Sequence, residues 1–356
     1  MLSKTYPLAH IALIPLYISL AFYLNLIPST VSDNLSSLLR LAKANLQSQY
    51  LKSTISTTTT ISMNFVARKS QDRGNADHGW LKTFHTFSFA SYASFIVHLF
   101  LSLIEPSSRY QDRQHQSFGP LRVINEDRVA PNTGFGAHSH REFEIFSYVV
   151  AGEIEQFVSI PFCCLYFQTN RFTYSKDSMG NTEILRRGDL QLTSAGTGIS
   201  HSEKAHGRNE THFLQIWSIP STSRLQPKYF TRHFTDEEKT DKWARIVAPV
   251  GADGVLHARE GEGPAPVQSA LTLYATLLGQ NKSLNRPVTG KKGYIHVIQT
   301  SGYNPGQSKG ANIKIVSNGE ELSLGEGDGA YVFVENSFEV ENVGDRVAEV
   351  LFFDLD

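Results

Sequence analysis

Two stretches of sequence decide the fold of this chain: residues 134–144, GFGAHSHREFE, and residues 194–203, SAGTGISHSE. Each stretch combines glycines, which permit tight turns, with a polar pair of the form His-x-His or His-x-Glu. Successive side chains of a β-strand point to opposite faces, so His138 and His140 point to the same side of their strand, and His201 and Glu203 point to the same side of theirs. Two such pairs on neighbouring strands would bring four side chains to one point inside a β-barrel.

The sequence around these stretches also predicts β-structure. Short β-prone runs punctuated by glycine or other turn residues occur at residues 143–150, 182–185, 213–217, 294–298 and 330–334. This rhythm is typical of an all-β barrel or sandwich. One short connecting helix is predicted at residues 236–243, where acidic residues come first and basic ones later. We therefore predict two β-domains, residues 64–235 and residues 236–356.

The charge balance bears on the class of partner. The 356 residues contain 33 Lys and Arg against 34 Asp and Glu, and no basic run occurs. Phosphate binding needs clustered basic side chains, so we expect no direct binding of nucleic acid. Cys163 and Cys164 are the only cysteines and are adjacent, so they cannot join distant segments.

The first 63 residues differ in kind from the rest. Residues 8–27 carry no Asp, Glu, Lys or Arg and are long enough to cross a bilayer as a helix. Residues 28–62 are rich in Ser and Thr and hold one acid, Asp33, as in an organellar transit segment. Met63 is itself a candidate start of translation. We rank a dispensable leader first, a targeting segment second and a membrane anchor third.

The two polar pairs suggest a metal site. Imidazole and carboxylate ligands together suit divalent iron, manganese, nickel, copper or zinc. Three histidines with one carboxylate leave coordination positions open for water, oxygen or a chelating substrate. A single His-x-His arises readily by chance, whereas two pairs with matching strand parity beside glycine-rich turns are a stronger signal.

A family resemblance rests on motifs spread over residues 73–356. The motifs that resemble the pirin family are HGW (78–80), FHTFSF (84–89), FGPLRV (118–123), FGAHSHREFE (135–144), GEIE (152–155), DSMGN (177–181), GDLQ (188–191), SAGTGISHSE (194–203) and LQIW (214–217). The resemblance implies a bicupin, in which two cupin jelly-roll barrels pack face to face. It further implies that the first barrel holds iron through His138, His140, His201 and Glu203, and that the second barrel is metal-free.

Two departures from the family pattern qualify the ligand set. Position 139 is Ser where the family usually has Pro, which loosens the backbone between two ligands and removes neither. The general cupin pattern places a Glu four residues after the second His, here Glu144, whose parity matches His138 and His140. We favour Glu203 as the fourth ligand and keep Glu144 as the alternative.

The resemblance implies two functions of different classes. One is a dioxygenase that opens flavonols such as quercetin with O₂, using Fe(II), or else Cu, Ni, Mn or Zn. In that function Glu203 takes the substrate's hydroxyl proton, and Phe135 and Phe143 line an apolar pocket. The other is a redox-sensing nuclear cofactor that binds transcription-regulator proteins. We expect a cytoplasmic or nuclear protein, or a mitochondrial or membrane-anchored one if the leader is retained.

Two segments interrupt the β-pattern, residues 93–109 and residues 157–176. Both contain apolar runs that do not alternate with polar residues, so each is either a buried strand or a hydrophobic loop. Members of the pirin family run almost directly across both positions. The segments are therefore interpreted as translated introns or as lineage-specific loops.

Overall fold

The computed structural model describes residues 64–87, 114–159 and 181–356. Within these residues the strands form two seven-stranded and two four-stranded sheets, and nearly all paired strands are antiparallel. The helices there are the short η2 (Ser70–Asp72) and α4 (Asp236–Lys239). The prediction of an all-β chain is thus confirmed, as are strands at each of the five predicted runs.

The first barrel pairs one large sheet with one small sheet. In the order of neighbouring strands, its seven-stranded sheet contains β12 (Lys228–His233), β9 (Asp189–Ser194), β6 (Glu144–Ala151), β11 (Thr211–Ser218), β4 (Leu121–Val129), β3 (Leu81–His85) and β2 (Gly74–Asp77). Its four-stranded sheet contains β5 (Gly134–His140), β10 (Ile199–His206), β7 (Glu153–Ser159) and β8 (Asn181–Arg186). His138 and His140 therefore lie on β5, and His201 and Glu203 lie on the neighbouring strand β10.

The second barrel repeats this plan. Its seven-stranded sheet contains β1 (Phe65–Arg68), β20 (Gly329–Val332), β17 (Lys292–Val297), β22 (Ala348–Leu355), β15 (Leu271–Leu278), β13 (Ala244–Pro249) and β14 (Ala265–Val267). Its four-stranded sheet contains β16 (Ser283–Pro287), β21 (Ser337–Asn342), β18 (Asn312–Ser317) and β19 (Glu320–Gly325). Apolar side chains fill the space between these two sheets, among them Phe338, Val340 and Ile313.

The two seven-stranded sheets pack against each other through one apolar core. Strands β6 and β11 contribute Phe146, Leu214 and Ile216, and strands β17 and β22 contribute Tyr294 and Phe353. Burial of large apolar side chains is the main favourable contribution to such an interface. The face-to-face arrangement of two barrels is therefore confirmed, and each four-stranded sheet covers the far side of its own barrel.

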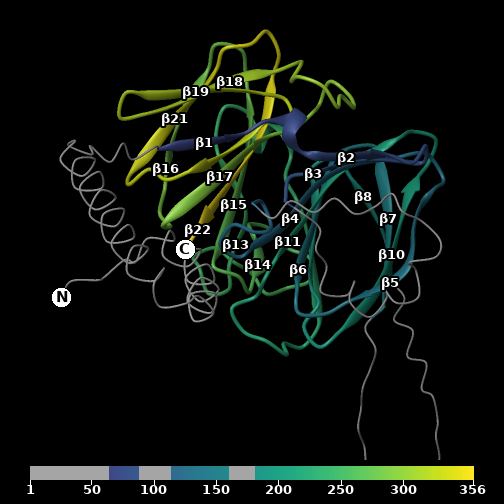
Figure 1. Cartoon of the computed structure of the whole chain (residues 1–356). Coiled ribbons are helices and arrows are strands. Elements are labelled where there is room, and N and C mark those ends of the chain that lie inside the picture. The colour runs from purple at the N-terminus through teal and green to yellow at the C-terminus, as the bar shows by residue number, and fades with distance from the viewer. Residues whose placement is uncertain (1–63, 88–113, 160–180) are drawn as a thin grey trace, which may run out of the picture. The chain divides into compact units, whose positions relative to one another are not determined.

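The chain's first described strand belongs to the second barrel. β1 pairs with β20 in register from Phe65↔Val332 to Arg68↔Gly329, and Figure 1 shows it beside the yellow-green strands of that barrel. At the corresponding edge of the first barrel, β12 pairs with β9. Residues 64–68 therefore add a strand to a barrel that is otherwise built from residues 244–355.

The connection between the barrels includes the predicted helix. α4 covers Asp236–Lys239, the first half of the predicted segment. Thr235 accepts a hydrogen bond from the Glu238 backbone, and the Glu238 side chain accepts one from the Thr235 backbone. This capping box fixes where the helix begins.

Several sequence-based predictions fall on residues outside the described ranges. The leader over residues 1–63 and the segment 93–109 lie outside them. Of the segment 157–176, Phe157–Ser159 continue strand β7, where Val158 pairs with Asn181 of β8, and the remainder lies outside. Among the described residues no helix is long and apolar enough to span a membrane.

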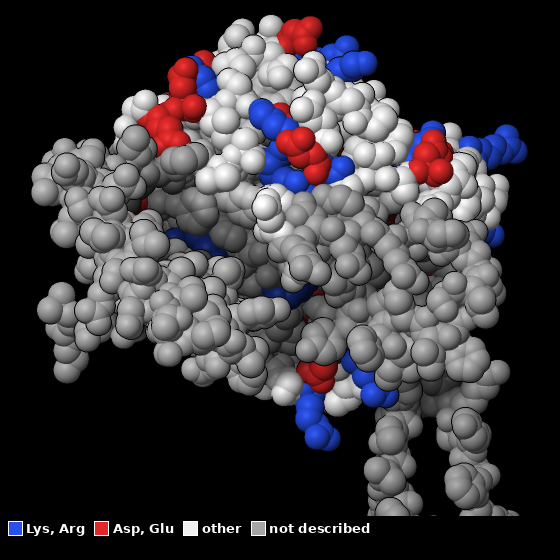
Figure 2. Space-filling view, in the orientation of Figure 1, with Lys and Arg blue, Asp and Glu red and all other residues white. Residues whose placement is uncertain are grey.

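Charged side chains of both signs are interspersed on the surface. On the face drawn in Figure 2, the described basic and acidic residues lie side by side, without an area of one sign. Exposed ion pairs of the described residues include Arg186 with Glu153 and Lys314 with Glu341.

A buried charged cluster joins the two barrels. Glu126 of β4 faces away from its own barrel and accepts hydrogen bonds from His212 (3.0 Å), His296 (3.3 Å), Arg73 (3.3 Å) and the Gln299 backbone (2.6 Å). Burial alone would raise the pKa of Glu126, but the hydrogen bonds from His212 and His296 and the charge of Arg73 bring this pKa well below its ordinary value. The carboxylate is therefore ionised in the folded protein and ties residues of both barrels together.

We predict that Glu126→Gln lowers the free energy of unfolding at pH 7 by about 3 kcal/mol, because the buried Arg73 guanidinium loses its counter-charge. Because folding lowers the pKa of Glu126, its contribution is present above the unfolded-state pKa and is lost as the pH falls through the folded-state pKa. Chemical denaturation at pH 7 measures the effect. The exposed pair partner Glu153, changed to Gln, should shift the free energy by less than about 0.5 kcal/mol. Equal effects of the two substitutions would contradict this account.

Candidate metal centre

The register between β5 and β10 brings three histidines together. His138 pairs directly with His201, and Ile199 pairs with His140. His138 and His201 therefore share one face of the sheet, and His140, two residues beyond His138, lies on the same face. This face is the interior of the first barrel, where His140 is 9% and His201 is 2% exposed.

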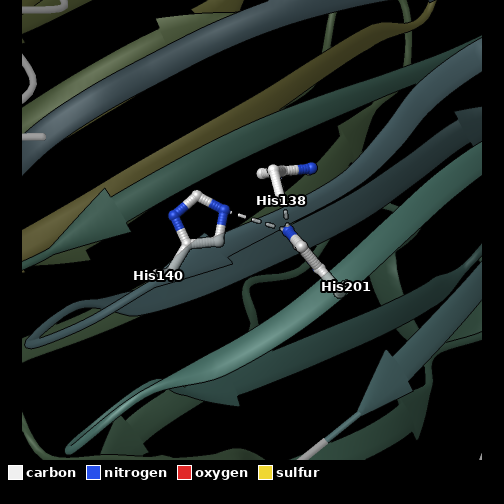
Figure 3. A group of neighbouring side chains, drawn as sticks. All are labelled: His138, His140 and His201. Carbon is white, nitrogen blue, oxygen red and sulfur yellow. Dashed lines mark hydrogen bonds between the residues drawn. The ribbon is translucent and has the colours of Figure 1, made fainter. Parts of the chain in front are cut away.

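The three imidazoles converge through their Nε2 atoms. His201 Nε2 lies 3.0 Å from His140 Nε2 and 3.0 Å from His138 Nε2, and Figure 3 shows the rings pointing toward one another. The ligand atoms of the three histidines all lie within 4.8 Å of one another. Two nitrogens that each lie about 2.1 Å from one ion, at about a right angle, are about 3.0 Å apart. The separations therefore suit a divalent transition metal.

The protonation of the rings also suits a metal. The His138 Nδ1–H donates to the Gly136 carbonyl at 2.8 Å, which leaves the Nε2 lone pair directed at the cluster. Burial and the neighbouring histidines lower the pKa of His140 and of His201 to about 3. Both rings are consequently neutral at pH 7, the form in which imidazole binds a metal. The buried Nδ1 of His201 has no hydrogen-bond partner among the described residues.

Glu203 lies in the same barrel interior but is not a member of the three-histidine cluster. Gln156 donates to its Oε1 at 2.5 Å, and Gln215 donates to its Oε2 at 3.0 Å. Burial raises the pKa of Glu203, while the hydrogen bonds from these amides act in the opposite direction. The structure thus presents a buried carboxylate beside the histidines, held by two side-chain amides from β7 and β11.

Glu144 occupies a different place. Its Oε1 accepts from Ser194 Oγ at 2.5 Å, and its Oε2 accepts from the Gln268 backbone at 3.1 Å. β5 ends at His140 and β6 begins at Glu144 in the other sheet, with Glu142 in the left-handed region at φ 59°. Strand alternation does not continue across such a turn between sheets. The even spacing between His140 and Glu144 therefore does not put Glu144 on the face that carries the histidines.

The two predicted pocket aromatics are separated. Phe135 lines the cavity beside the histidines and contacts Trp80, with ring centroids 5.4 Å apart. Phe143 packs on Trp217, with centroids 5.2 Å apart, and is not among the residues that line this cavity. Phe135 is three residues from His138 and would face outward in a regular strand. A bulge between the pairs His201↔His138 and Glu203↔Phe135 returns Phe135 to the inner face.

A row of polar side chains, which the sequence analysis did not identify, crosses the interior opposite the histidines. The pairs His85↔Asn125, Asn125↔Gln215, Gln215↔Ser147 and Ser147↔Gln191 align across β3, β4, β11, β6 and β9. We call these five residues the polar row. Their signal in the sequence is a polar side chain within a buried β-run, such as Gln215 in FLQIW. Ser147 and Gln215 of this row contact the Glu203 carboxylate.

A cavity of about 560 Å³ opens beside the cluster. It is lined by His78, Trp80, Leu81, Thr83, His85, Asn125, Asp127, Gly134, Phe135, Gly136, His138, His140, Glu203, Gln215 and Trp217. Cavities of roughly 300–1,000 Å³ with mostly apolar walls and a few polar groups are typical of sites for small organic ligands. The arrangement can therefore place a small aromatic molecule next to a metal ion and a carboxylate.

The sequence matches one family model and several curated proteins. Residues 166–218, which include His201 and Glu203, match the family model described as Pirin. The quercetin 2,3-dioxygenase of Escherichia coli strain K12 is 31% identical over 290 residues, which cover 81% of this chain and 97% of that protein. A pirin-like protein of Caulobacter vibrioides is 29% identical over 255 residues, covering 70% and 90% of the two chains.

A solved structure shares both the fold and the sequence relationship. The bacterial pirin YhhW of Escherichia coli in complex with nickel(II) matches with a TM-score of 0.59 and 28% identity, over 82% of this chain and 98% of that chain. Its fold corresponds to the two barrels described above. The extent and identity of these matches show that this chain belongs to the pirin family.

Proposed function

We propose that this protein is a metal-dependent dioxygenase that opens flavonols such as quercetin with O₂, and that its metal is Fe(II). The observation that carries the proposal is the three-histidine cluster facing a cavity that also holds the buried Glu203 carboxylate. The naming of a 31% identical relative as quercetin 2,3-dioxygenase supports the substrate class. By affinity alone such a site would prefer copper, so the supply of metal decides which ion occupies it. Elemental analysis of protein from its native source tests the choice of iron.

The residues divide the work as follows. His138, His140 and His201 hold the metal, with Glu203 as the fourth ligand or as the base. Held by these residues, a divalent metal would supply Lewis acidity toward the flavonol hydroxyl and proximity between the substrate and O₂. Glu203 takes the hydroxyl proton, because its raised pKa lets the carboxylate hold a proton at the moment of transfer. Gln156 and Gln215 fix the orientation of that carboxylate.

The apolar walls position the planar substrate. Trp80 and Phe135 form an edge-to-face pair at the cavity, and Trp217 packs against His140 with ring centroids 4.8 Å apart. Aromatic side chains bury large areas of a flat ligand and exclude water from it. Exclusion of water strengthens the electrostatic interactions that hold the deprotonated substrate.

We predict that His201→Ala abolishes stoichiometric metal binding and leaves both barrels folded, because one of three converging nitrogens is lost. Metal content after reconstitution with Fe(II), together with circular dichroism, measures this outcome. His206→Ala is the matched control, since His206 lies on the same strand but its side chain is 40% exposed and pairs with Glu155. Retention of one metal ion per chain by His201→Ala would show that the ligand set is wrong.

We predict that the Fe(II)-loaded protein consumes quercetin, and that Glu203→Gln lowers kcat by about 10²-fold or more through loss of the base. Loss of the flavonol absorbance follows the reaction. Glu155→Gln, an exposed carboxylate on neighbouring β7, should retain full activity. Absence of turnover by the parent protein with iron, copper, nickel and manganese would exclude this function and favour a non-catalytic role, such as binding transcription regulators.

A further inference from the structure

One acidic side chain of the cavity has no role in the reaction described so far. Asp127 of β4 lines the cavity and is only 3% exposed. Its Oδ1 has no hydrogen-bond partner among the described residues. Leaving a buried carboxylate oxygen without a donor is costly, so an unpaired oxygen at a cavity wall points to a donor supplied from the cavity.

The strand register fixes where Asp127 lies. Trp217, which packs on His140, pairs with Val123 of β4, and Gln215, which contacts Glu203, pairs with Asn125. Asp127 is the next inward-facing residue along the same strand. Inward-facing neighbours on a strand are about 7 Å apart, so Asp127 lies about 13 Å along β4 from the level of Val123. A ligand bound at the histidines by one end therefore extends toward Asp127.

The surroundings of Asp127 indicate the chemistry of the ligand group that would lie beside it. Its cross-strand partners are Phe213 and Thr83, and Leu81 and Phe135 line the same part of the cavity. Among the described residues no Lys or Arg lines the cavity to neutralise the carboxylate. Burial raises the pKa of Asp127 to about 7, the Thr83 hydroxyl acts in the opposite direction, and the Glu203 carboxylate adds to the rise. The mostly apolar surroundings of the Asp127 carboxylate thus suit an apolar ligand that donates one hydrogen bond to it.

We propose that Asp127 accepts a hydrogen bond from a ring hydroxyl of the substrate, at the end remote from the metal, and so selects polyhydroxylated flavonols over simpler ones. This inference rests on the proposed function for the substrate class. It assigns to Asp127 the specificity for a hydroxyl that does not take part in chelation. A buried charged acceptor discriminates strongly against an analogue that lacks the donor, because the acceptor is then left unpaired.

Two flavonols separate the two binding contacts. 3-Hydroxyflavone carries only the chelating hydroxyl and carbonyl, whereas quercetin also carries ring hydroxyls. Binding is measured by isothermal titration calorimetry at pH 8, on Zn(II)-loaded full-length protein without O₂, so that no turnover occurs. We expect the parent protein to bind quercetin at least tenfold more tightly than 3-hydroxyflavone.

Substitution of Asp127 should remove only that preference. Asp127→Asn is expected to weaken quercetin binding about tenfold and to leave 3-hydroxyflavone binding within twofold, and Asp127→Ala should weaken quercetin binding at least as much. The exposed Asp345, changed to Asn, serves as the control and should alter neither affinity. Because folding raises the pKa of Asp127, the neutral Asn should also leave the melting temperature unchanged or higher, whereas a purely structural role would lower it.

Two results would overturn the proposal in distinguishable ways. Unchanged quercetin affinity in both Asp127 variants refutes the hydroxyl contact and leaves the proposed function intact. Failure of the metal-loaded parent protein to bind either flavonol refutes the proposed function, and the assignment of Asp127 with it.

Discussion

The register of β5 against β10 sets the geometry on which the site depends. Directly opposed residues of an antiparallel pair have Cβ atoms about 4.5–5.5 Å apart, so the pairing His138↔His201 brings two imidazoles within reach of one ion. His140 joins them because it lies two residues further on the same face. A slip of one residue would turn His138 and His140 outward together. Burial then keeps His140 and His201 neutral and open to a cation.

The same barrel plan serves two interiors of opposite character. In the first barrel the polar row and Glu203 lie between apolar clusters at either end, one around Phe213 and one around Trp217. In the second barrel the strands at the corresponding positions, β16 and β21, contribute Leu284, Phe338 and Val340 to a closely packed apolar core. Function therefore resides in the side chains placed on the fold, and the fold alone does not specify it.

Strand β4 couples the stability of the protein to its site. Alternation sends Asn125 and Asp127 into the cavity and Glu126 into the interface with the second barrel. There the hydrogen bonds from His212 and His296 and the charge of Arg73 hold Glu126 ionised. The wall of the cavity is thus fixed from behind by contacts with the other barrel, which favours a preorganised site.

The sequence by itself determined the all-β class, the main strands and the face that His138 shares with His140, because strand alternation and glycine turns are local properties. That His201 joins this pair depends on the pairing of β10 with β5, which only the tertiary structure decided. The sequence could not place Phe143 and Glu144, since the chain turns from one sheet to the other after His140 and the strand alternation ends there. The bulge that turns Phe135 inward is equally invisible to a strict two-residue period. Only the tertiary structure revealed Asp127 and the amides that hold Glu203, because their grouping depends on pairing between strands far apart in the chain.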